Sequence, residues 1–134
     1  MDGKIVVRGG ATLTVEAGTI VKAETEDGAD ATVLVIAKGG MINAVGTADN
    51  PIIFTDNDDQ IGYDDSGISP NRVPSDMGKW GSIVVLGNAS TGTDTGEAEI
   101  EGIATGYEWT NYGGSDDTEN SGNIEYVSIR HSGK

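Results

Sequence analysis

The chain of 134 residues contains no cysteine, one histidine, one phenylalanine and three prolines. Without cysteine the protein can form no disulfide, and it has no thiolate to serve as nucleophile or metal ligand. Hydrophobic residues make up only 36% of the chain and aromatic residues 5%, which is little for a compact globule of this length. No apolar run approaches the roughly 18 residues that a membrane-spanning helix needs, so we expect no direct membrane insertion.

Basic residues are scarce, with 8 Lys and Arg against 22 Asp and Glu, for a formal net charge of −14. The acid is concentrated in two stretches. Residues 56–76 carry six Asp against one Arg, and residues 91–120 carry eight acids and no base. No basic stripe is present to neutralise phosphates, so we expect no nucleic acid partner.

Glycine is abundant, with 21 residues, and it marks the corners of an internal repeat. Residues 5–15 recur 30 positions later as residues 35–45, so that a glycine pair falls on a glycine pair and Val6 falls on Ile36. A repeat of about 30 residues, built from short β-rich runs and glycine turns, indicates stacked equivalent units.

The pattern predicts an all-β protein, a right-handed parallel β-helix (a solenoid) of about three to four coils with negligible α-helix. Two long acidic loop insertions, residues 56–78 and 88–121, interrupt the repeat. We expect strands at residues 4–8, 11–16, 19–24, 32–37, 41–45, 52–55, 80–86 and 123–130. A two-sheet sandwich is the alternative, but the repeated units run in the same order and lack the two-residue hairpin turns that a sandwich would need.

An inward-facing column of apolar residues follows from this repeat. Its expected members are Val6, Leu13, Val15, Ile20, Ile36, Val45, Ile52, Val84, Ile124 and Ile129. Trp80 is expected to be a wall or core residue at the start of a strand.

Several motifs extend in order along essentially the whole chain. They are Gly3-Lys4-Ile5-Val6-Val7, Gly46-Thr47-Ala48-Asp49-Asn50-Pro51-Ile52-Ile53-Phe54-Thr55, Gly78-Lys79-Trp80-Gly81, Leu86-Gly87-Asn88-Ala89 and Gly122-Asn123-Ile124-Glu125-Tyr126-Val127. With them the chain resembles the N-terminal part of the large exported bacterial right-handed parallel β-helix repeat proteins, a surface or lipoprotein-like family without assigned activity. The resemblance implies a secreted or cell-surface location, and one β-helix domain over residues 1–134 that is a fragment of a longer solenoid. No signal peptide stands in this chain.

Polysaccharide cleavage has to be weighed, because pectate lyases and polygalacturonases share the right-handed β-helix. A lyase needs a Lys or Arg base beside Ca²⁺-binding acids, and a hydrolase needs paired carboxylates on one face. Bases are scarce, and Arg130-His131 is the one pair of a basic residue with an imidazole. We therefore expect a non-enzymatic structural or interaction module, with a carbohydrate-binding or polysaccharide-cleaving protein as the alternative.

Calcium is the cofactor that the acidic loops suggest, since clustered carboxylates in flexible loops suit Ca²⁺ better than Zn²⁺. The alternative is a solvated acidic surface that keeps the protein soluble. No catalytic residue is predicted. The candidate metal ligands are Asp56, Asp58, Asp59, Asp64, Asp65, Asp116 and Asp117.

Three aromatic residues, Tyr107, Trp109 and Tyr112, cluster inside the second insertion. They are candidates for a sugar-stacking platform that would bind polysaccharide, or else anchors that hold the loop on the solenoid wall. Arg8 and Lys38 are expected to stack along one edge of the coils, either solvated or paired with carboxylates.

Self-association is expected at the coil ends. The last predicted strand leaves a row of unpaired backbone groups and the apolar residues Ile124, Val127 and Ile129 without a covering segment. Such edges favour end-to-end pairing with a second copy.

Overall fold

The structure, a computed structural model, describes residues 1–26, 28–103 and 105–133. Within these ranges the chain forms eleven strands and two 3-10 turns. The described residues contain no α-helix, which agrees with the all-β prediction. The strands are β1 (Lys4–Val7), β2 (Thr12–Val15), β3 (Ile20–Ala23), β4 (Val33–Ile36), β5 (Met41–Val45), β6 (Ile52–Asp56), β7 (Ser82–Val85), β8 (Glu97–Glu99), β9 (Asn111–Gly113), β10 (Gly122–Glu125) and β11 (Val127–Ile129). The turns are η1 (Gly28–Asp30) and η2 (Glu108–Thr110).

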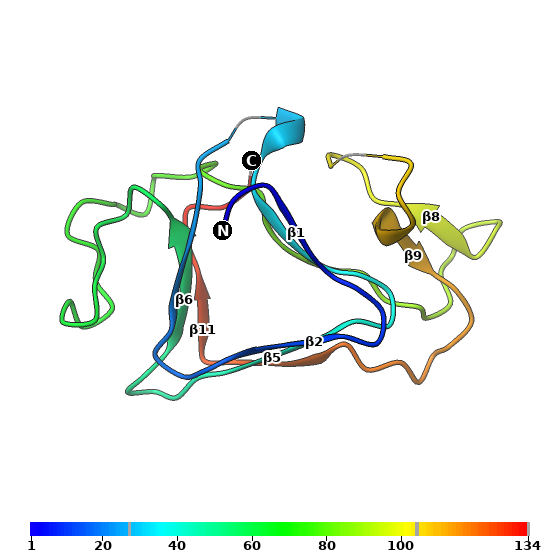
Figure 1. Cartoon of the computed structure of the whole chain (residues 1–134), viewed down its shortest axis with the longest axis horizontal. Helices are drawn as coiled ribbons and strands as arrows, with labels where there is room; N and C mark the ends of the chain where they lie inside the picture. The colour runs from blue at the N-terminus through cyan, green and yellow to red at the C-terminus, as the bar shows by residue number, and fades with distance from the viewer. Residues whose placement is uncertain (27, 104, 134) are drawn as a thin grey trace.

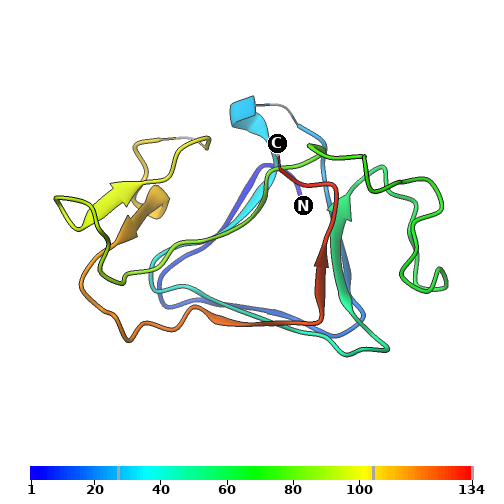
Figure 2. The same cartoon turned by 180° about the vertical axis from the view of Figure 1, so that it is seen from behind.

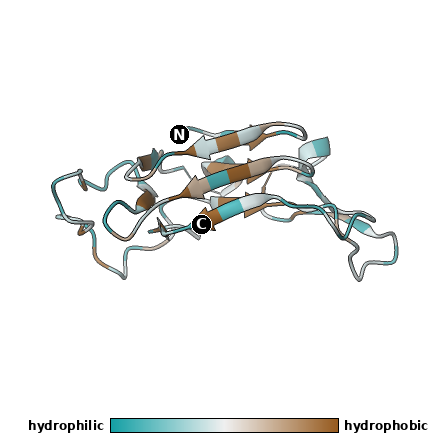
Figure 3. Cartoon of the chain, turned by 90° about the horizontal axis from the view of Figure 1, so that it is seen from below, coloured by the Kyte–Doolittle hydropathy of each residue, from teal (hydrophilic) through white to brown (hydrophobic). Residues whose placement is uncertain are grey.

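Three parallel sheets form the framework, and they lie along the sides of a triangle (Figure 1). Their strand orders are β1-β4-β7, β2-β5-β10 and β3-β6-β11, so every sheet takes one strand from each successive pass of the chain. Figure 3 shows the strands stacked in layers, with apolar and polar positions alternating along them. This parallel arrangement excludes the two-sheet sandwich and leaves β8 and β9 as the antiparallel pair of a separate hairpin.

The register between the first two passes differs by one residue from the sequence repeat. Lys4 lies opposite Val33 and Val7 opposite Ile36, which is an offset of 29 residues instead of the predicted 30. The corner explains the slip, because Gly10 stacks on Gly39 and both have positive φ, 82° and 72°. In a strand a shift of one residue turns every side chain to the other face.

The inner core contains four of the ten residues predicted for it, Leu13, Val15, Ile36 and Ile52. The buried residues of this core that the prediction left out are Val7, Ala23, Leu34, Ile42, Ala44 and Phe54. Six predictions were wrong. Val6 and Val84 pack in a separate cluster, Ile20 belongs to neither cluster, and Val45, Ile124 and Ile129 are 44%, 47% and 44% exposed.

Trp80 is a core residue as predicted, with none of its surface exposed, and its indole N–H donates to the carbonyl of Arg130 at 2.8 Å. The predicted closing strand, residues 123–130, is instead two strands, β10 and β11. Tyr126 separates them with a φ of 50°, and this corner turns the chain from the second sheet into the third.

Two long segments leave the framework, here named the first loop segment (residues 57–81) and the second loop segment (residues 86–121). Figures 1 and 2 both show them projecting from opposite sides of the triangle. Because the first follows the third sheet and the second follows the first sheet, each lies at a different corner of the framework.

Candidate functional site

A cleft of about 470 Å³ lies between the framework and the second loop segment. One wall comes from the corners that follow β1 and β4, and it carries Arg8 and Lys38. The other wall comes from the hairpin and η2. It carries Glu97, Glu108, Trp109 and Asn111. The cleft therefore places cations, carboxylates, an amide and an indole around one volume.

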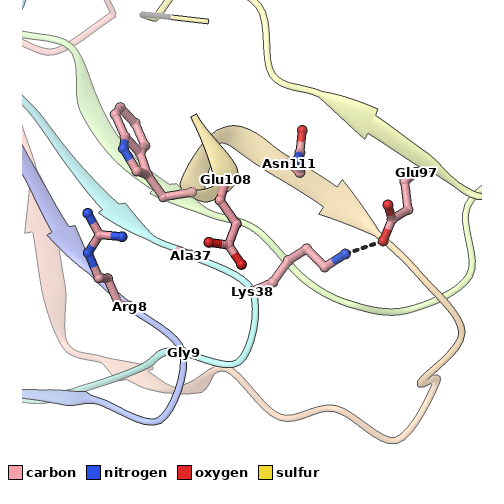
Figure 4. A pocket seen from close by; sticks show the side chains of 8 residues that line it. Arg8, Gly9, Ala37, Lys38, Glu97, Glu108 and Asn111 are labelled. Atoms are coloured by element: carbon pink, nitrogen blue, oxygen red, sulfur yellow. Dashed lines mark hydrogen bonds and ion pairs between the residues drawn. The ribbon is translucent and has the colours of Figure 1, made fainter. Parts of the chain in front are cut away.

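The two cations of the cleft differ in their surroundings. Lys38 is paired with Glu97 at 2.5 Å, and its side chain is 24% exposed. Arg8 is exposed and forms no ion pair with any described residue. Figure 4 shows Lys38 reaching across to Glu97, and it shows the Glu108 carboxylate turned toward the side where Arg8 and Lys38 lie. The carboxylate pairing expected for this edge is thus present at Lys38.

The aromatic residues hold the second loop segment against the first sheet. Trp109 and Tyr112 pack on a cluster built around Val33 and Val35, whose side chains face outward from β4 and are buried. Tyr107, 53% exposed, stacks on Trp109 with ring centroids 5.3 Å apart and planes 20° apart. The anchoring role is therefore visible, and sugar stacking by these residues stays a prediction.

Two glutamates of the second loop segment hold its backbone. Glu99 accepts hydrogen bonds from the Thr110 hydroxyl at 2.6 Å and from the Gly106 N–H, and these bonds lower the pKa of Glu99 below its ordinary value. Glu119 accepts from the Gly39 N–H at 2.6 Å and from the Asn88 N–H. Because Gly39 belongs to the framework corner and Asn88 to the start of the segment, Glu119 ties both to the end of the segment.

Asp116 and Asp117, predicted as metal ligands, also accept hydrogen bonds from nearby protein groups. The hydroxyl and N–H of Thr118 lower the pKa of Asp116, and the Ser90 N–H, at 2.8 Å, lowers the pKa of Asp117. Both carboxylates are exposed; Asp116 fixes a local turn, and Asp117 joins the end of the segment to Ser90 near its beginning.

Asp56, at the end of β6, is completely buried and paired with Arg72 of the first loop segment. Arg72 donates to both carboxylate oxygens, and this hydrogen bonding raises the pKa of Arg72. The guanidinium also lies 3.6 Å from the exposed Asp58. One cation thus neutralises the buried acid and approaches its exposed neighbour.

Asp59 is also completely buried. Burial opposes its ionisation, but hydrogen bonds from the Ser69 hydroxyl, the Thr55 hydroxyl and the Ile61 N–H outweigh that cost and lower the pKa of Asp59. His131 Nε2 lies 4.0 Å away. The predicted solvated loop therefore begins with two acids that are buried and fully engaged by protein groups.

Of the remaining predicted metal ligands, Asp64 is exposed, and Asp65 accepts from the Gly62 N–H at 2.7 Å. Among the described residues, no group of three or more His, Asp or Glu side chains could hold a metal ion. Calcium stabilisation stays a prediction, which a comparison of Tm in excess Ca²⁺ and in EDTA tests.

Sequence reasoning identified Arg8, Lys38 and Trp109 but missed Glu97, Glu108 and Asn111 as partners in the same cleft. The missing information was the β8–β9 hairpin, which brings these residues back over the framework. A short Glu-Ala-Glu stretch was the only sequence signal for β8.

Parallel sheets whose strands come from successive passes of one chain define a β-helix protein. The chain belongs to the pectate-lyase-like β-helix domain family, whose model matches residues 1–134. No curated protein and no solved structure gives a significant match. In the part of the chain that the structure describes, no helix is long and apolar enough to cross a membrane.

Proposed function

We propose that this chain is a non-enzymatic structural and interaction module of an exported or cell-surface bacterial protein, part of a right-handed solenoid of about three to four coils. The observation that carries the proposal is how the acids of the two loop segments are used. Asp59, Asp76, Glu99, Asp116 and Asp117 all have a pKa below the ordinary value, because each carboxylate accepts hydrogen bonds from its own segment or from β6.

Acid catalysis by a carboxyl group at neutral pH requires a pKa shift in the opposite direction. A carboxyl that donates a proton near pH 7 needs a raised pKa, which burial without hydrogen-bond donors provides. Here the hydrogen bonds stabilise the ionised form and at the same time order the loop. The arrangement supports a role for these carboxylates in shaping a binding surface.

The test is incubation of the full chain with acidic and neutral polysaccharides, followed by assays for reducing ends and for unsaturated products. No turnover is expected, with or without Ca²⁺. Turnover that disappears in an Asp59→Asn variant with an intact circular dichroism spectrum would overturn the proposal.

Carbohydrate binding without cleavage is the second candidate, and the cleft beside Trp109 favours it. The apolar face of a sugar ring can stack on the indole. The charged and amide groups beside it can donate hydrogen bonds to the sugar hydroxyls and accept hydrogen bonds from them. Binding is measured by calorimetry against the same polysaccharides. Glu108→Ala, at an exposed position where the carboxylate accepts no hydrogen bond from any described residue, should weaken binding without disturbing the fold. Equal affinity of the variant and the wild type would contradict this candidate.

Self-association is part of the proposed interaction role. β10 and β11 are edge strands, and Ile124 and Ile129 on them are about half exposed. Pairing of these edges with a second copy would satisfy the free backbone groups. Sedimentation of the chain over a wide concentration range tests this, and a monomer throughout would contradict it.

A further inference from the structure

A second cavity, of about 460 Å³, lies beside the first loop segment, which projects from the opposite side of the framework to the second loop segment (Figure 2). One wall is the part of the first loop segment between residues 67 and 77, and the other is the end of β11 with Arg130 and His131. Its size is within the range of pockets that bind small molecules, about 300–1,000 Å³. The carbohydrate cleft does not use it, and of its lining residues only Ile129 also belongs to the edge proposed for self-association.

Large apolar side chains are concentrated on its walls. Ile68, Val73 and Met77 of the first loop segment are 72%, 54% and 73% exposed, and Ile129 opposite them is 44% exposed. Single exposed apolar side chains are ordinary, but several around one hollow are typical of a binding site. They provide a surface for an apolar ligand without further rearrangement of the core.

The charged groups at this cavity differ in whether they are already neutralised. Arg72 is paired with Asp56. The carboxylate of Asp76 accepts a hydrogen bond from the Val73 N–H at 3.0 Å. The backbone carbonyl oxygen of Asp76 lies 2.6 Å from Nδ1 of His131. These groups are engaged within the protein.

Arg130 is the exception. Its Nε donates to the Ser128 hydroxyl at 2.8 Å, which fixes the plane of the guanidinium. Within residues 1–26, 28–103 and 105–133, its two terminal nitrogens donate no hydrogen bond and form no ion pair. In a chain with 22 acids and a net charge of −14, a partly buried guanidinium left without a carboxylate stands out.

We propose that this cavity binds a small amphipathic carboxylate, of the chemical class of a medium-chain fatty acid. The ligand carboxylate pairs with the terminal nitrogens of Arg130, which match its geometry in a bidentate contact. The apolar chain lies against Ile68, Val73 and Met77. Charge complementarity thus selects the head group, and the exposed apolar wall selects the body.

Titration of the full chain with decanoate, followed by calorimetry, tests the proposal. Decanol, which lacks the charge, and acetate, which lacks the chain, are the comparison ligands. We expect saturable binding of decanoate, at least about tenfold tighter than that of decanol or acetate. A difference in affinity of about tenfold is what one charge-assisted hydrogen-bonded contact contributes. Equal affinity for decanol and decanoate, or binding that does not saturate, overturns the proposal.

Arg130→Gln should weaken decanoate binding about tenfold and remove its advantage over decanol, while Arg130→Lys restores part of it. Lys4→Gln removes the same unit of charge from β1, which does not line the cavity, and should leave the affinity unchanged. If Lys4→Gln weakens binding as much as Arg130→Gln, the effect is general electrostatics and the site is wrong.

Met77→Ser gives a test that does not depend on Arg130 and its contact with Ser128. Because Met77 is 73% exposed, its replacement should not disturb folding, yet decanoate binding should weaken roughly tenfold from the lost apolar contact. In the wild type, decanoate should shift the methyl resonance of Met77 and leave that of Met41 on β5 unchanged. An unchanged Met77 resonance at saturation overturns the proposal.

Discussion

The two loop segments are both acidic, yet different kinds of interaction attach them to the same framework. The first loop segment is attached through charge and hydrogen bonds where it begins, with the buried acids Asp56 and Asp59 engaged by Arg72 and Ser69, and through the buried indole of Trp80 where it ends. The second is attached through apolar packing of Trp109 and its neighbours on the outer face of the first sheet, with ionised groups on its surface. Net charge therefore does not reveal how a loop is held.

The difference has an energetic consequence. A buried charge left without its partner is costly, whereas an exposed pair contributes little and an apolar anchor contributes in proportion to the area it buries. The first segment should therefore respond sharply to single polar changes, and the second mainly to loss of its anchors.

The largest effect is expected from Arg72→Met, which leaves Asp56 buried and unpaired. The free energy of unfolding should fall by about 3–5 kcal/mol in urea denaturation. Lys38→Met breaks the partly exposed pair with Glu97 in the second segment and should cost only about 0–1 kcal/mol. Equal losses in the two variants would remove the distinction between the segments.

Trp109→Ala should follow, with a loss of about 2 kcal/mol, because the side chain is only partly buried and leaves part of its contact surface open to water. Amide exchange should increase in residues 86–121 and stay unchanged in the first loop segment. Tyr63→Ala, in the first segment and 81% exposed, is the matched control and should stay within about 0.5 kcal/mol. Faster exchange in both segments would show that they are coupled.

The pH dependence of the free energy of unfolding should also differ between the two segments, by less than the effects of the substitutions above. The folded-state pKa of Asp59 is lowered, so its contribution is fully present above the unfolded value of about 3.9 and is lost as pH falls through the folded value. Asp59→Asn should therefore flatten the acid side of the stability profile, measured by urea denaturation from about pH 6 to pH 2.

Asp117→Asn, at an exposed position of the second segment, is the control for this profile and should flatten it less. Identical profiles for the wild type and Asp59→Asn would contradict the assignment.

A small effect is expected from Glu119→Ala, which removes the acceptor shared by the Gly39 and Asn88 N–H groups. The loss should be about 1 kcal/mol in thermal denaturation, since both donors can turn to water. Asp94→Ala, in the same segment and without a hydrogen bond to its carboxylate from any described residue, should change nothing measurable. A larger loss than for Trp109→Ala would mean that this polar tie, rather than the apolar anchor, holds the segment.

The candidate sites show where sequence reasoning reached its limit. Trp109 was identified because three aromatic residues cluster in the second insertion, but Glu97 and Glu108 became its neighbours only through a hairpin that begins with a three-residue strand. The apolar cavity beside Arg130 had no sequence signal, since Ile68 and Met77 are separated from Ile129 by more than fifty residues.

The sequence by itself determined the framework strands β1 to β7, the glycine corners and the all-β parallel order, because these follow from local alternation and from a repeat. The register was decided by tertiary structure, since stacking of Gly10 on Gly39 sets the offset at 29 residues. That single step pairs Val6 with Val35 in place of Ile36, and both valines lie in the outer cluster. Local alternation identifies two faces of a strand, but only the corner geometry and the segment packed against one of them decide which face is the core.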